Sequence, residues 1–213
     1  LTGLANHRLL DIRLSEQLME SEHNAAGYLL FLRLADLAGL NQTLGGAKTD
    51  ELIRNIATVI KQYLTKPHRF EWLGSRSRAG EFTIVAPGLT AEDADKLAVE
   101  LVNTLDNLAL ARESRMSPLA YIGIGAFNPG DQAKAVLDRA DQALAQAQGT
   151  PGTTWARLDD SAARVDANAQ DWRGWIDDAL KQNKLKLYFQ PVTECANDGK
   201  LQARLTQPGE KTP

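Results

Sequence analysis

The stretch Ser75–Phe82, SRSRAGEF, holds the residues whose types and spacing come nearest to a site for chemistry. It lies between two segments that predict β-strands, so it predicts the turn of a hairpin. Its one carboxylate, Glu81, can supply an oxygen to a divalent cation such as Mg²⁺, which prefers hard carboxylate ligands. Strand alternation puts Phe82 and Ile84 on the opposite face, where packing explains them. Glu81 lacks a companion ligand nearby, which favours a solvated or ion-paired carboxylate.

A second polar stretch, NQTLGGAKTD, runs from Asn41 to Asp50. Asp50 directly precedes the helical pattern ELIRNIATVI, where a carboxylate can cap free amide groups. Asn41 is a residue type that suits a turn. Local structure therefore explains both residues without any ligand, although both also have the chemistry to hydrogen-bond one.

Composition limits the classes of partner. The 213 residues carry a net charge of −3, which gives no electrostatic reason to expect a nucleic-acid partner. The single Cys195 excludes an intrachain disulfide framework and a cysteine-rich metal site. No apolar run reaches the roughly 18 residues that a membrane span needs. We therefore expect a soluble piece, which can be the cytoplasmic part of a longer protein.

The order of predicted elements is helix–strand–helix–strand–strand–helix–strand–helix–strand, which is typical of an α/β domain. The apolar run at residues 26–36 predicts a strand that is buried on both faces. The other strands are predicted at residues 68–76, 81–88, 117–127 and 153–158, and the helices at 9–22, 51–64, 91–108 and 131–148.

Three segments follow from these patterns. Residues 1–160 form the α/β domain, and residues 161–184 form a linker and a helix. Trp172 and Trp175 share one face of that helix, which predicts that they dock it onto a neighbouring domain. Residues 185–213 contain one further strand and are too short to complete a second core, so they predict the beginning of another domain.

Four sequence pieces in order resemble the GGDEF family, the diguanylate cyclases that join two GTP molecules into cyclic di-GMP. They are LTGLANHR, NQTLGGAKTD, RAGEF and ADQALAQAQ, spread over residues 1–160. The resemblance implies a central, mostly antiparallel sheet flanked by helices. LYFQPV at residues 187–192 resembles the first strand of an EAL domain. Residues 25–53 and 81–88 are similar to the LapD-type receptors of cyclic di-GMP.

The resemblance implies that the cyclase chemistry is lost. The family holds its divalent cations with carboxylates that fall here at Arg33 and Gly80, a guanidinium and a bare backbone. The family's phosphate-binding lysine falls at Gln148. We therefore expect neither a metal nor another cofactor and no catalytic residues. The degenerate hairpin consists of Arg78, Ala79, Gly80, Glu81 and Phe82.

Three further sets of family ligands map onto this sequence. Asn41 and Asp50 fall where the family hydrogen-bonds the guanine edge, as an alternative to their turn and cap roles. The RxxD pair of the inhibitory product site falls at Arg69 and Trp72, so the aspartate is missing and feedback binding is not expected. Gln190 falls at an EAL-domain contact for cyclic di-GMP.

The function implied is a non-catalytic signalling module in the cytoplasmic part of a bacterial inner-membrane receptor. A complete EAL domain would bind cyclic di-GMP, and the receptor would control a periplasmic protease and so the retention of a biofilm adhesin. A homodimer is compatible with this function. Two alternatives stay open: a GTP-binding regulatory domain of an active EAL phosphodiesterase, and a residual diguanylate cyclase.

Overall fold

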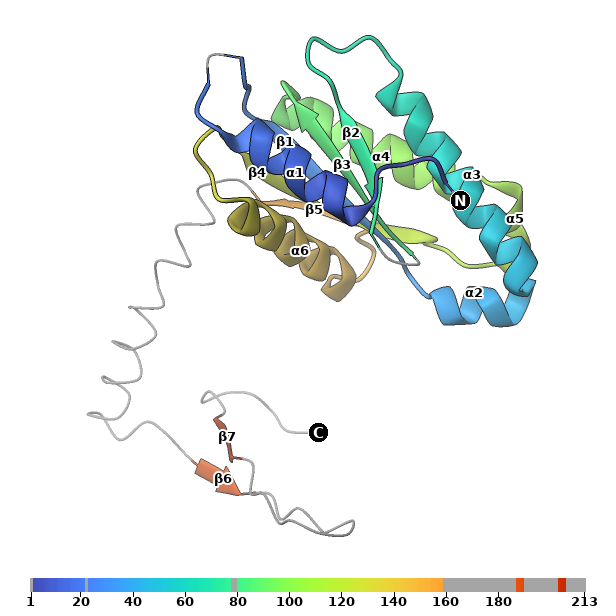
Figure 1. Ribbon diagram of the computed structural model, residues 1–213. Coiled ribbons are helices and arrows are strands. Elements are labelled where there is room, and N and C mark those ends of the chain that lie inside the picture. The colour runs from blue at the N-terminus through green and yellow to red at the C-terminus, as the bar shows by residue number, and fades with distance from the viewer. Residues whose placement is uncertain (1, 22, 78–79, 159–186, 190–202, 206–213) are drawn as a thin grey trace. The chain divides into compact units, whose positions relative to one another are not determined.

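The computed structural model describes residues 2–21, 23–77, 80–158, 187–189 and 203–205 (Figure 1). The chain divides into two compact units, Leu1–Ala163 and Arg164–Pro213. In the described part, no helix has the length and apolar character that crossing a membrane requires.

The first unit contains five strands and six helices among its described residues. The strands are β1 (Gly27–Leu34), β2 (Leu73–Arg76), β3 (Glu81–Pro87), β4 (Ala120–Phe127) and β5 (Trp155–Leu158). The helices are α1 (His7–Leu18), α2 (Leu37–Leu44), α3 (Gly46–Leu64), α4 (Ala91–Asp106), α5 (Ala109–Ser114) and α6 (Ala133–Gly149).

The five strands form one mixed sheet in the order β2-β3-β1-β4-β5. The β1 strand pairs antiparallel with β3 and β4, β2 pairs antiparallel with β3, and β4 pairs parallel with β5. The predicted α/β architecture with a mostly antiparallel sheet is confirmed. The middle position of β1 explains its nearly continuous apolar sequence, because helices cover both faces of this strand.

Each face of the sheet packs against a different pair of long helices. Leu30 and Leu32 of β1 belong to a core cluster with α3 and α4, whereas Leu29 belongs to a second cluster with α1 and α6. Strand alternation divides the β1 side chains between these clusters. Even-numbered residues of β1 therefore face α3 and α4, and odd-numbered residues face α1 and α6.

The stretch predicted to be a turn, NQTLGGAKTD, is helical instead. It spans the end of α2 and the start of α3, which begins at Gly46 and not at residue 51. Gly45 separates the two helices with a φ of 78°, a left-handed conformation that suits glycine, and its N–H donates to the Asn41 carbonyl. Asp36 begins α2, since its side chain accepts a hydrogen bond of 2.8 Å from the Gly39 amide.

Other boundaries also differ from the prediction. Helix α1 ends at Leu18, because the Asn24 side-chain amide donates to the carbonyls of Glu16 and Met19 and caps the helix end. Strand β2 starts at Leu73 and not at residue 68. The short helix α5 was not predicted from the sequence.

The second unit has two short strands in its described residues, β6 (Leu187–Phe189) and β7 (Ala203–Leu205). They pair antiparallel, with Leu187 opposite Leu205. Trp172, Trp175, Gln190 and Cys195 lie outside the described residues.

Candidate functional site

The end of β1 places Arg33 between two other strands. Arg33 lies opposite Glu81 in the β1–β3 pair and opposite Tyr121 in the β1–β4 pair. As an odd-numbered residue of β1, it extends from the face that α1 and α6 cover. The guanidinium carbon of Arg33 is 5.4 Å from the centre of the Phe31 ring, two residues earlier on the same face.

Two carboxylates meet the Arg33 guanidinium. Its Nε donates to Glu81 Oε1 at 3.1 Å, and its Nη2 donates to Asp141 Oδ1 at 3.2 Å. The Arg33 side chain is 36% exposed and that of Glu81 is 23% exposed, so the first pair is partly shielded from water. Asp141 is 58% exposed. Glu81 is thus an ion-paired carboxylate.

Glycines of β4 bring Asp141 to this position. A Cβ atom on Gly123 would lie 2.7 Å from the Cβ of Leu144, and one on Gly125 would lie 2.9 Å from the amide nitrogen of Ala140. Real Cβ atoms essentially never approach other atoms this closely. Helix α6 therefore rests directly on the backbone of β4, and the residue after Ala140 reaches across to β1.

Two backbone hydrogen bonds hold the turn between β2 and β3. The Ser77 amide donates to the Glu81 carbonyl at 3.1 Å and closes the turn, and the Leu34 amide of β1 donates to the Gly80 carbonyl at 3.0 Å and joins the turn to β1. A Cβ atom on Gly80 would lie 3.3 Å from two carbons of the Leu34 side chain. Phe82 is fully buried in the core cluster of α3 and α4. Arg78 and Ala79 lie outside the described residues.

Asn41 and Asp50 extend into solvent from two different helices. Asn41 lies on α2, and Asp50 lies more than one turn inside α3. The interpretation of Asp50 as the cap of its helix is wrong, because Gly45 holds the cap position. In the described part of the chain, neither side chain takes part in a hydrogen bond or ion pair. Nearby, Lys48 of α3 pairs with Glu113 of α5 at 2.5 Å.

The remaining predicted positions do not join Arg33 in one site. Gln148 is exposed at the end of α6. Arg69 precedes β2 and is not on a strand, and its guanidinium carbon lies 5.4 Å from the Phe70 ring centre. Trp72 stacks on the His68 ring at 3.6 Å with an interplanar angle of 7°. The His68 ring covers one face of the Trp72 ring, so that face is not open to a ligand.

Sequence reasoning missed Asp141. Asp141 belongs to the motif ADQALAQAQ, but nothing in this motif indicates that Asp141 pairs with Arg33. Among the described residues, no group of three or more histidine, cysteine, aspartate or glutamate side chains lies close enough to hold a metal ion.

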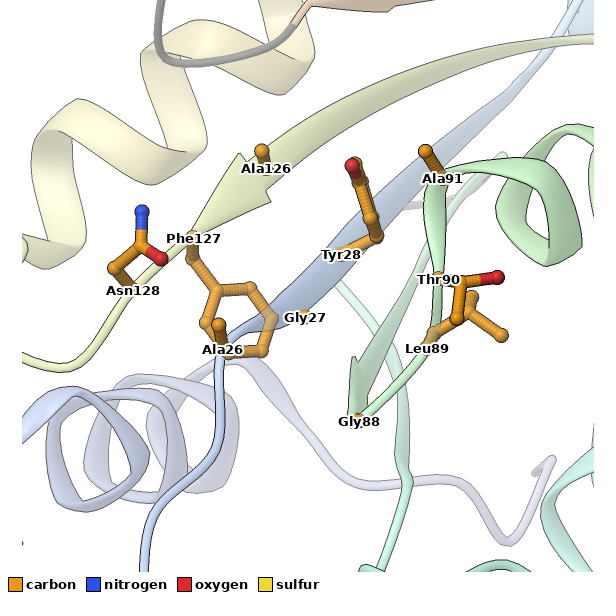
Figure 2. A pocket seen from close by; sticks show the side chains of 10 residues that line it. All are labelled: Ala26, Gly27, Tyr28, Gly88, Leu89, Thr90, Ala91, Ala126, Phe127 and Asn128. Carbon is orange, nitrogen blue, oxygen red and sulfur yellow. The ribbon is translucent and has the colours of Figure 1, made fainter.

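A cavity of about 450 Å³ lies at the other end of β1. The start of β1, the end of β4, the connection at residues 88–90 that follows β3, and Ala91, the first residue of α4, line it. Figure 2 shows the Tyr28 ring standing between the end of β4 and the start of α4. Thr90 caps α4, and its hydroxyl both accepts from the Asp93 amide and donates to the Asp93 carboxylate. None of the residues predicted to form a site lines this cavity.

Comparisons with known proteins agree with this fold. Residues 1–153 match the family described as "Diguanylate cyclase, GGDEF domain". The chain is 25% identical over 192 residues to the RNase E specificity factor CsrD of Escherichia coli (strain K12). That match covers 90% of this chain and 29% of the relative.

Two solved structures share the architecture. The GGDEF domain of DgcB from Caulobacter crescentus, in complex with c-di-GMP, has a TM-score of 0.61 at 24% identity and covers 74% of this chain and 89% of its own. Vibrio cholerae LapD S helix-GGDEF-EAL, bound to c-di-GMP, has a TM-score of 0.63 at 17% identity. This second match covers 98% of this chain and 48% of the LapD chain. At these identities, the likeness shows the fold alone.

Proposed function

The chain belongs to the GGDEF family, and from this premise we propose that it is a non-catalytic module of a cyclic di-GMP receptor. The observation that carries the proposal is the Arg33 guanidinium at the end of β1, held by Glu81 and Asp141. In the family resemblance, this is one position of a metal-binding carboxylate. The other position is Gly80, which has no side chain.

These residues do not fit a magnesium ion. At about 4 Å and an effective dielectric constant of about 20, one positive charge repels a divalent cation by about 8 kcal/mol. The carboxylates of Glu81 and Asp141 already accept hydrogen bonds from Arg33, so a metal would have to displace the guanidinium to reach them. Exposed Gln148 adds no positive charge for a triphosphate. We therefore derive no metal-dependent step for this domain.

The proposed role is to relay the occupancy of an EAL domain. In this proposal, the chain belongs to the cytoplasmic part of a LapD-like inner-membrane receptor that controls a periplasmic protease and biofilm adhesion. The second unit supplies the start of the EAL domain, whose strand residues 187–189 lie directly before Gln190. Cyclic di-GMP can shift such a receptor only by its difference in affinity for two arrangements.

Two measurements test the proposal. Incubation of the purified chain with GTP and MgCl₂, beside an active GGDEF cyclase, gives no cyclic di-GMP above the no-protein control. Product above that control would overturn the non-catalytic assignment. For the relay, amide hydrogen exchange is measured on the full-length receptor with and without cyclic di-GMP. We expect altered exchange within residues 1–158, and unchanged exchange there would refute the relay.

A second candidate function rests on Asn41 and Asp50. Both side chains are exposed and, within the described residues, neither is engaged by another protein group. A carboxylate at Asp50 suits the N–H donors of a guanine edge, which favours a GTP-binding regulatory domain of an EAL phosphodiesterase. Calorimetry with GTP separates the candidates. Tight binding that Asp50→Ala abolishes and Asp93→Ala retains would favour this function, and absence of binding would eliminate it.

A further inference from the structure

The Arg33 cluster (Arg33, Glu81 and Asp141) joins three elements that are distant in the sequence. Glu81 is 48 residues from Arg33 and begins β3, and Asp141 is 108 residues from Arg33 and lies on α6. The guanidinium meets each carboxylate with a different nitrogen, so one side chain bridges both. This is the connectivity that a cation held by two carboxylates provides.

Within the described residues, Arg33 is the one cation that pairs with either carboxylate. Glu81 is the first residue of β3, directly after the hairpin turn, and its carbonyl accepts from the Ser77 amide. The amide of Leu34, next to Arg33, donates to the Gly80 carbonyl. The ion pairs therefore lie at the turn end of the hairpin, beside the Ser77–Glu81 hydrogen bond that closes the turn and the Leu34–Gly80 hydrogen bond that joins it to β1.

We propose that the Arg33 guanidinium is a built-in cation that fixes the start of β3, at the hairpin turn, to α6 by bridging Glu81 and Asp141. The hairpin then keeps its position without any metal. Removing the guanidinium leaves Glu81 and Asp141 without a counter-charge and loosens the turn end of the hairpin. It also frees both carboxylates to attract a divalent cation from solution. This inference does not rest on the proposed function, since it concerns the folded chain alone.

The test compares two arginine substitutions in the whole 213-residue chain. Arg33→Met removes the charge and keeps an unbranched apolar stem. Arg13→Met is the matched control, because Arg13 pairs with Glu16 at 3.3 Å while both side chains are more than half exposed. Exchange of the Leu34 and Ser77 amides is followed by NMR or by mass spectrometry. We expect Arg33→Met to speed their exchange about threefold to tenfold, the range of a modest ion-pair loss, and Arg13→Met to leave it unchanged.

Magnesium provides the second arm of the test. MgCl₂ slows exchange of the two amides in Arg33→Met toward the original rate and leaves the unsubstituted chain unaffected. Unchanged amide exchange in Arg33→Met, or exchange in that variant that magnesium does not slow, would overturn the proposal.

If Arg33→Met does not fold, Arg33→Lys replaces it, because an ammonium keeps the charge and loses the planar fork that serves two carboxylates. Faster exchange in that variant supports the bridge, and an unchanged rate refutes it. Cyclase activity in the unsubstituted chain would refute the proposed function and leave this result untouched.

Discussion

Substitution of Gly123 by alanine tests how α6 is held against the sheet. The added Cβ would lie 2.7 Å from the Leu144 Cβ and closer still to the Ala140 carbonyl oxygen. A backbone oxygen cannot rotate away as a side chain can, so α6 must shift as a unit. Overpacking of a core lowers the free energy of unfolding by about 1–3 kcal/mol, and we expect this backbone clash to fall at the upper end of that range. In a domain of this size, about 3 kcal/mol lowers Tm by about 6–12 °C.

The matched control for Gly123→Ala is Gly149→Ala. A Cβ on Gly149, the last residue of α6, meets nothing within 4 Å, and alanine favours a helix over glycine by up to about 1 kcal/mol. Thermal unfolding followed by circular dichroism measures both variants. We expect a large fall in Tm for Gly123→Ala and an unchanged or higher Tm for Gly149→Ala. Equal Tm values in the two variants would refute the direct packing of α6 on β4, and with it the route that brings Asp141 to Arg33.

Three smaller predictions concern the elements around the site. Phe82→Ala removes a fully buried ring and lowers the free energy of unfolding by about 3–5 kcal/mol in urea titrations, and a loss below 1 kcal/mol would contradict the core position. Asp36→Ala removes the side-chain cap of α2 and costs about 0.5–2 kcal/mol, whereas Asp36→Asn keeps the acceptor and stays near the original stability. Thr90→Ala removes the cap of α4 at a cost of about 1 kcal/mol, and Thr90→Ser restores it; equal losses in both would show that the hydroxyl is unimportant.

The sheet was predictable because its strands carry strong local signals. The apolar run around β1 indicated a strand buried on both faces, and β1 is the middle strand. The prediction of a turn in the α2–α3 region was wrong because Gly45 and Gly46 suggested a loop. In the structure, Gly45 caps the end of α2 and α3 begins at Gly46, so the two glycines mark the boundary between two helices. The Asp36 side chain was the available signal, since aspartate before an apolar helical pattern predicts a helix start.

The candidate site was predictable only in part. Counting along the resemblance gave Arg33 its position, and strand alternation gave Glu81 a face apart from buried Phe82. The ion pair between them follows from the β1–β3 register, which no local pattern encodes. The contact between Asp141 and Arg33 depends on residues still farther apart in the sequence, because Asp141 reaches Arg33 only when Gly123 allows α6 to touch the sheet.

The net charge of the Arg33 cluster limits which ligands the domain can bind at this end of the sheet. Arg33 carries one positive charge against the two negative charges of Glu81 and Asp141, so the cluster is negative overall. A nucleoside triphosphate is itself strongly negative and would need cations to offset that charge. In the described residues, the Arg33 guanidinium is already shared by two carboxylates. The negative charge of Glu81 and Asp141 therefore opposes a triphosphate beside the hairpin, and this charge balance supports the proposed non-catalytic function over turnover of GTP.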